Sequence, residues 1–114
     1  MSKNKLRKFK EVTAFSNTIE LTDFQDNDHE KPAGKWNSEV FKNDKPIITE
    51  LACGKGEYTC TLARKFPEYN YVGIDIKGAR IWKGAKKALE NNWDNVRFLR
   101  IYIDHLAEYF APNE

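Results

Sequence analysis

The sequence predicts an α/β fold in which parallel strands alternate with helices. The apolar run I-I-T-E-L-A leads directly into a short loop that contains Gly54 and Gly56. A second apolar run, Y-V-G-I-D, ends on Asp75, nineteen residues after Gly56, and the residues between the two runs have helical spacing. An apolar strand, a glycine loop, a helix and a strand that ends on a carboxylate form the pattern with which Rossmann-like sheets bind a nucleoside.

The remaining elements follow from periodicity. We expect strands at 47–52, 69–75 and 96–103, and helices at 57–66 and 78–91, with a third helix beginning at 105–110. Ile81 and Ala85 recur on one helix face and are expected to pack on the sheet. Since a doubly wound sheet usually takes about 150 residues or more, a chain of 114 residues predicts an incomplete fold made of the first three strands and their helices.

The chain divides into two predicted parts. Residues 1–46 form a basic N-terminal arm and leader segment, and residues 47–114 form the sheet domain. Lysines and arginines crowd the arm, which we expect to be disordered until it contacts phosphates, or else simply to be a solubilising terminus. Its candidate phosphate-binding residues, which would contact a nucleic acid, are Lys3, Lys5, Arg7 and Lys8. The first strand, 47–52, is central in such sheets, so an incomplete sheet would leave it with an apolar edge, which predicts low stability or self-association.

The glycine loop explains how a ligand could approach. Gly54 and Gly56 lack a Cβ atom, so the backbone can turn sharply and let a ligand lie against the helix N-terminus. Asp75, at the end of the neighbouring strand, could accept hydrogen bonds from both ribose hydroxyls. The alternatives are an ordinary buried strand with a glycine turn, and Asp75 as a helix N-cap.

The nature of the ligand follows from the residues around the glycines. A dinucleotide fingerprint would need a third glycine where the chain has Thr59. The pattern acidic-x-G-x-G-x-G fits better, with Glu50 as the acid and Ala52 in place of the first glycine. A carboxylate at Glu50 would repel a pyrophosphate and attract an ammonium or sulfonium group. S-adenosylmethionine therefore fits better than NAD.

Charge and composition restrict the function further. The net charge is only +2, and no run of about 18 apolar residues could span a membrane, so we expect a cytoplasmic protein with no membrane contact. The cysteines and histidines lack the spacing of a zinc site, so no metal is expected. The helix at 78–91 carries a basic face with Arg80, Lys83 and Lys87, beside Lys77. It is either a solvated surface or a phosphate contact, with Lys77 and Arg80 nearest the predicted cofactor site.

The stretches E-L-A-C-G-K-G-E-Y, Y-V-G-I-D-I-K-G-A-R-I-W-K-G-A and N-V-R-F-L-R resemble the first half of bacterial tRNA (guanine-N7-)-methyltransferases. The resemblance implies a class I S-adenosylmethionine-dependent methyltransferase fold, and methyl transfer to N7 of a guanine in the tRNA variable loop. It departs at Ala52, where the family commonly has glycine, and at Tyr102, where many members have an acid. The implied cofactor-binding residues are Glu50, Ala52, Gly54, Gly56, Asp75, Ile76 and Tyr102.

No catalytic residue can be assigned within the chain. The resemblance implies that the P-D motif holding the guanine would lie beyond Glu114, so we expect residues 1–114 alone to be inactive. Guanine N7 has a free lone pair, so transfer depends mainly on proximity and alignment. Two other functions stay open, namely a methyltransferase of small molecules and a non-catalytic RNA- or nucleotide-binding fragment.

Overall fold

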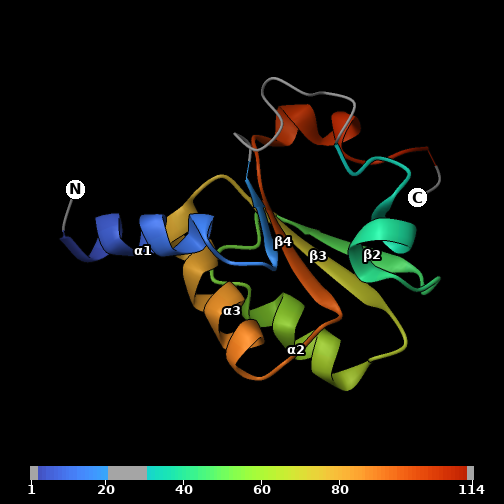
Figure 1. Ribbon diagram of the computed structural model, residues 1–114, viewed down its shortest axis with the longest axis horizontal. Helices are drawn as coiled ribbons and strands as arrows, with labels where there is room; N and C mark the ends of the chain where they lie inside the picture. Colours follow the sequence, from blue (N-terminus) through green and yellow to red (C-terminus); the bar gives the residue numbers. More distant parts are fainter. Residues whose placement is uncertain (1–2, 21–30, 113–114) are drawn as a thin grey trace.

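The strands form one parallel, four-stranded sheet in the order β1-β4-β3-β2 (Figure 1). This computed structural model describes residues 3–20 and 31–112. The strands are Thr18–Glu20 (β1), Ile47–Leu51 (β2), Asn70–Asp75 (β3) and Val96–Arg100 (β4). The expected α/β class and its Rossmann-like order of strand, helix and strand are confirmed, although the third expected strand ends at Arg100 and not at 103.

Helical segments cover both faces of the sheet (Figure 1). The helices α1 (Lys3–Thr13), α2 (Glu57–Lys65) and α3 (Gly78–Glu90) lie on one face. A π-helical turn, η3 (Trp36–Phe41), and a 3-10 helix, η4 (Ile103–Glu108), lie on the other. The two expected helices, 57–66 and 78–91, are confirmed to within one residue at each end, whereas the helix expected at 105–110 is a 3-10 helix that begins at Ile103.

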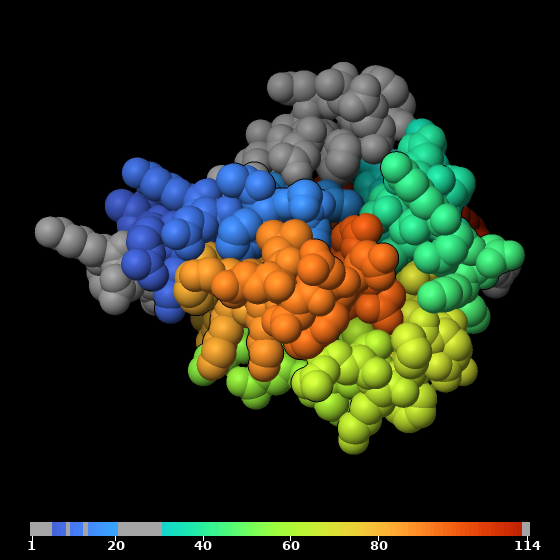
Figure 2. All heavy atoms as spheres, turned by 60° about the horizontal axis from the view of Figure 1, so that its bottom comes forward, coloured from blue at the N-terminus to red at the C-terminus, as the bar shows by residue number. Residues whose placement is uncertain are grey.

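The basic N-terminal arm is helical, so the expectation of a disordered arm is wrong. Figure 2 shows α1 lying alongside α3 on the surface of the molecule. Val12 is fully buried, and the indole Nε1 of Trp82 on α3 donates a hydrogen bond to the Glu11 carboxylate. This helix depends on contacts with a distant residue, Trp82, which the charges of the segment do not reveal.

The leader segment contributes strand β1, which sequence periodicity did not reveal because the strand has only three residues. Glu20 stands opposite Arg100 in the parallel register, and their side chains form an ion pair of 2.8 Å. The guanidinium Nε of Arg100 also donates to the carbonyl oxygen of Ile76 at 2.8 Å. Arg100 therefore ties β1 to the turn that follows β3.

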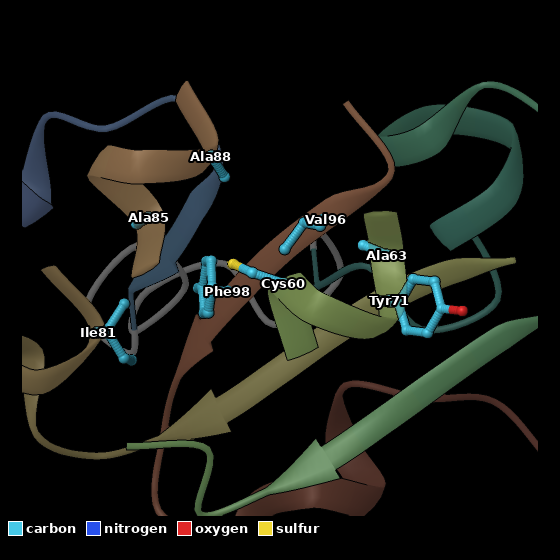
Figure 3. Close-up of a cluster of buried hydrophobic side chains, with 8 residues drawn as sticks. All are labelled: Cys60, Ala63, Tyr71, Ile81, Ala85, Ala88, Val96 and Phe98. Carbon is cyan, nitrogen blue, oxygen red and sulfur yellow. The ribbon is translucent and has the colours of Figure 1, made fainter. Parts of the chain in front are cut away.

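The main core lies between the sheet and the helices α2 and α3, where side chains from α2, α3, β3 and β4 meet (Figure 3). Three glycines surround the ring of Phe98. A Cβ atom added to Gly56 would lie 2.7 Å from Phe98 Cε1, and one added to Gly73 or Gly84 would lie 3.0 Å from the ring. At Gly84 it would also lie 2.5 Å from the Lys55 carbonyl oxygen. The absence of these side chains lets α3 contact the glycine loop directly.

A second core fills the opposite face of the sheet. Trp36 from η3 is fully buried, its Nε1 donates to the Tyr109 carbonyl oxygen at 2.6 Å, and its ring stacks on Phe110 at 5.0 Å. The residues packed with it include Val72, Ile74, Leu99 and Ile101. Both faces of β3 are consequently buried, as its continuous apolar sequence suggested.

Strand β2 is an edge of the sheet built by the described residues, because it pairs with β3 on one side only. Its apolar side chains are partly exposed, with Ile48 at 38% and Leu51 at 48%. This edge agrees with the exposed apolar edge predicted for the strand from the length of the chain. Self-association through it stays a prediction.

Replacing Gly84 with alanine tests the contact between α3 and the glycine loop. Helix propensity alone would make alanine more stable than glycine by about 1 kcal/mol. The clash with the Lys55 carbonyl oxygen and Phe98 should reverse the sign, so we expect Gly84→Ala to lower the free energy of unfolding by about 1–3 kcal/mol. Urea unfolding measures it, with the exposed α3 substitution Glu90→Ala as control. A stabilised Gly84→Ala protein would contradict the packing.

Candidate functional site

The glycine loop is fixed by hydrogen bonds to strand β3. The backbone N–H of Cys53 donates to the Ile74 carbonyl oxygen at 2.9 Å, and the N–H of Gly54 donates to Asp75 Oδ2 at 2.9 Å. Gly54 and Gly56 have φ angles of +58° and +71°, in the left-handed region that favours glycine. The loop therefore reaches its sharp turn without strain at these two residues.

Asp75 joins the glycine loop to the turn before α3. Its Oδ2 accepts from Gly54, and its Oδ1 accepts from the backbone N–H of Lys77 at 3.0 Å. The N-cap position of α3 is Lys77, so Asp75 is not the N-cap. Its side chain instead forms an Asx turn with the backbone N–H two residues later. Each carboxylate oxygen has two lone pairs, so both can still accept a further hydrogen bond from a ligand.

Glu50 is held by Thr59, which the sequence identified only as the position without the third glycine of a dinucleotide fingerprint. Thr59 on α2 is 2% exposed, and its hydroxyl donates a hydrogen bond to Glu50 Oε1. Glu50 itself is half-buried near the end of β2. The signal that could have identified Thr59 is its hydroxyl, placed among apolar residues on the buried face of the first helix.

The Cys53 thiol is affected by the negative charges of both Asp75 and Glu50. Burial, as the largest cause, and the negative charges of Asp75 and then Glu50 together raise the pKa of the Cys53 thiol to about 12. The thiol therefore stays protonated at neutral pH and is a poor nucleophile. The site has no activated cysteine at this position.

Ala52 and Gly54 differ in what they do to the loop. Ala52 has a φ angle of +55°, which costs a non-glycine residue roughly 1–2 kcal/mol. A Cβ atom added to Gly54 would meet nothing within 4 Å, so the space beside the loop is open. This open space, next to a carboxylate with free lone pairs, is compatible with a bound nucleoside.

Most of the predicted cofactor-binding residues meet at the carboxyl edge of the sheet, since Glu50, the loop and Asp75 follow from adjacent strands. Ile76 is half-buried just after Asp75. Tyr102 follows β4, the strand beside β3, and is 55% exposed. The structure places these residues at one edge, and their contact with a cofactor stays a prediction.

The predicted RNA-binding residues lie on α1 and at the start of α3. The Arg7 guanidinium and the Lys8 ammonium lie 6.0 Å and 4.8 Å from the centre of the Trp82 ring. Lys77 is exposed directly before α3, and Arg80 is exposed in its first turn. Lys3 and Lys5 belong to the first turn of α1. The packing of α1 on Trp82 thus joins two basic segments that are far apart in the sequence.

Two further classes of feature are not found in residues 3–20 and 31–112. No three His, Cys, Asp or Glu side chains there are grouped as metal ligands. Each helix of this part lacks the combination of length and apolar character that a bilayer span requires.

The sequence that forms the glycine loop and the neighbouring strands is similar to that of known methyltransferases. A family model described as "Putative methyltransferase" matches residues 44–114, the part of the chain that carries the glycine loop, Asp75 and β4. The chain belongs to this methyltransferase family. The matched region contains every predicted cofactor-binding residue.

Curated relatives of this methyltransferase chain carry the name tRNA (guanine-N(7)-)-methyltransferase. The protein from Christiangramia forsetii is 56% identical over 115 residues, which cover 99% of this chain and 51% of the relative. The Bacteroides fragilis protein is 45% identical over 100% of this chain and 46% of its own length. The Clostridioides difficile protein is 37% identical over 76% of this chain and 40% of its own length. The chain spans about half the length of the curated relatives it matches.

The pKa of Cys53 predicts a loss of stability in alkaline solution. The folded pKa of about 12 lies above the ordinary value of 9.0, so the folded state retains a proton that the unfolded thiol loses. The contribution of this protonated thiol to the free energy of unfolding is fully present below pH 9.0 and declines as the pH rises toward 12. We expect Cys53→Ser to reduce the fall in unfolding free energy between neutral pH and pH ~10.5 by about 1–2 kcal/mol. Denaturant titrations at both pH values measure this, and an unchanged fall would contradict the burial of this thiol.

Proposed function

We propose that the chain is the S-adenosylmethionine-binding half of an enzyme that methylates N7 of a guanine in tRNA. The observation that carries this proposal is the hydrogen bond from Gly54 to Asp75, which fixes a glycine loop beside a carboxylate that can accept from a ribose. Membership of the methyltransferase family supports the class of reaction. The names of the curated relatives support tRNA as substrate and guanine N7 as acceptor.

Each part of the donor has a fitting group in the chain. Asp75 would accept hydrogen bonds from the ribose hydroxyls, with Tyr102 and Ile76 near the adenine. Glu50, oriented by Thr59, would attract the positive ammonium group of the methionine end. The backbone around Ala52, Gly54 and Gly56 would lie against the same end. When bound, S-adenosylmethionine supplies a methyl group activated by its positively charged sulfur.

The chain's own residues have a positioning role in this reaction. Guanine N7 has a lone pair at neutral pH, so methyl transfer needs no base and depends on alignment of donor and acceptor. The proposal accordingly assigns no catalytic residue between positions 1 and 114. The cytosol, where tRNA is found, is the compartment we propose.

The basic residues of α1 and α3 would bind the tRNA backbone. Lys and Arg contacts to phosphates supply affinity that does not depend on base sequence and that falls with salt. Because α1 packs on Trp82, Arg7 and Lys8 are already held on the same side of the molecule as α3. We propose that they act together with Lys77 and Arg80. We propose that Lys3 and Lys5, at the start of α1, also contact the tRNA backbone.

A chimeric enzyme tests the function. Residues 1–114 would replace the corresponding half of the Christiangramia forsetii relative, with which they share 56% identity. Incubation with labelled S-adenosylmethionine and bulk tRNA should give labelled RNA that is cleaved at N7-methylguanine, whereas residues 1–114 alone should give little or none. Label in small molecules only, or binding without transfer by the chimera, would favour the two other functions considered from the sequence.

Substitution of Asp75 tests the cofactor site in a separate binding experiment. Loss of charged hydrogen bonds worth about 1.5–3 kcal/mol should weaken binding of S-adenosylhomocysteine to the chain by roughly 10- to 100-fold in Asp75→Ala, as measured by calorimetry. Asp75→Asn, which keeps one acceptor oxygen, should be intermediate. Glu90→Ala, which removes an exposed carboxylate from the far end of α3, is the control. Equal affinity of wild type and Asp75→Ala would refute the assignment.

A further inference from the structure

A cleft of about 260 Å³ lies between α2 and α3. We call it the α2–α3 cleft. Lys55 and Gly56 of the loop border it, but Glu50, Gly54 and Asp75 do not. It is therefore separate from the predicted cofactor site, and neither the family match nor the names of the relatives assign a role to it.

The shape of the cleft follows from the packing of the two helices. At one end they are close together, because Gly56 and Gly84 are both glycines and a Cβ atom on Gly56 would lie 3.6 Å from Gly84 Cα. Trp93, which follows α3, borders the other end. Lys83 and Lys87 are four residues apart on α3, so both lie on the helix face that borders the cleft.

The charge of the cleft is strongly positive. Four cationic residues border it, namely Lys55, Arg64, Lys83 and Lys87, against one acid, Glu57. Within residues 3–20 and 31–112, none of the four forms an ion pair with a carboxylate. Clefts lined by one sign of charge concentrate their field and attract ions of the opposite sign. The cleft is thus suited to an anion.

Trp93 packs against one of these cations, Arg64. The Arg64 guanidinium carbon lies 5.3 Å from the centre of the Trp93 ring, a cation–π contact that restrains the long side chain. A restrained guanidinium presents its N–H donors in a fixed fork, which matches the oxygens of a phosphate group. A phosphate is therefore the anion that this arrangement fits best.

We propose that the α2–α3 cleft binds a phosphate group of the tRNA backbone. This inference rests on the proposed function, because it takes the substrate to be RNA. The cleft is smaller than the roughly 300–1,000 Å³ of most small-molecule sites, so it suits a phosphate with its sugar and not a whole nucleotide cofactor. Figure 2 shows α1, α3 and α2 on one side of the molecule, so an RNA strand on α1 and α3 could reach the cleft.

Charge-removal variants of the full chain test the proposal. The double variant Lys83→Ala/Lys87→Ala and the single variant Arg64→Ala each remove cations from the cleft. The matched control, Lys45→Ala/Lys65→Ala, removes two exposed lysines that do not border it. Fluorescence anisotropy with labelled tRNA at several salt concentrations gives the affinity and its salt dependence. Urea unfolding and the affinity for S-adenosylhomocysteine show that each variant is folded with an intact cofactor site.

The expected results distinguish phosphate binding in the cleft from a general effect of removing positive charge. We expect the double cleft variant to bind tRNA roughly tenfold more weakly at low salt and to reduce the slope of log K against log salt by about 1–2. Arg64→Ala should reduce the slope by about 1, and the control should change the affinity less than twofold. Equal losses in the cleft and control variants, or unchanged binding in the cleft variants, would overturn the proposal.

A competition experiment distinguishes the source of the phosphate. Chemical shifts of the Trp93 indole and the Gly84 amide should move on addition of tRNA, and much less on addition of inorganic phosphate or a mononucleotide at the same concentration. Strong shifts with the small anions, together with unchanged tRNA affinity in the cleft variants, would overturn the RNA assignment. If those variants bind tRNA normally while the chimera still methylates it, only the cleft proposal fails and the proposed function stands.

Discussion

The close contact between the glycine loop and α3 above the ring of Phe98 is the constraint on which the site depends. Gly56 and Gly84 leave room for the ring, and the Lys55 carbonyl oxygen lies where a side chain at position 84 would be. The contact fixes the loop from the helix side, while the Gly54–Asp75 hydrogen bond fixes it from the sheet side. A loop held on both sides presents its backbone in one conformation, and such preorganisation is what a binding site requires.

The predicted cofactor site and the α2–α3 cleft carry opposite charges. At the carboxyl edge of the sheet, Glu50 and Asp75 form an acidic site suited to a cationic donor. Lysines and Arg64 line the α2–α3 cleft, which suits an anionic backbone. Under the proposed function, the positively charged cofactor and the RNA would each bind where the charge of the protein is opposite to their own. The glycine loop contributes to both places, because Gly54 donates a hydrogen bond to Asp75 while Lys55 and Gly56 border the cleft.

Much of the central fold could be predicted from sequence because its signals are local. The apolar strands, the glycine loop and the helix periodicity of 57–66 and 78–91 identified β2, α2, β3 and α3. The placement of Asp75 beside the loop followed from spacing alone. Strand β1 and helix α1 were missed because their stability comes from distant partners, Arg100 and Trp82, which no local pattern reveals. The role of Thr59 was missed for the same reason, since its hydroxyl donates a hydrogen bond to Glu50 on strand β2.

The most direct measurement is a crystal structure of the chain with S-adenosylhomocysteine bound. The account predicts that both ribose hydroxyls lie within hydrogen-bond distance of the Asp75 carboxylate, and that the amino acid end lies beside Glu50 and the glycine loop. A ligand bound at another position, or one whose ribose has no contact with Asp75, would contradict it.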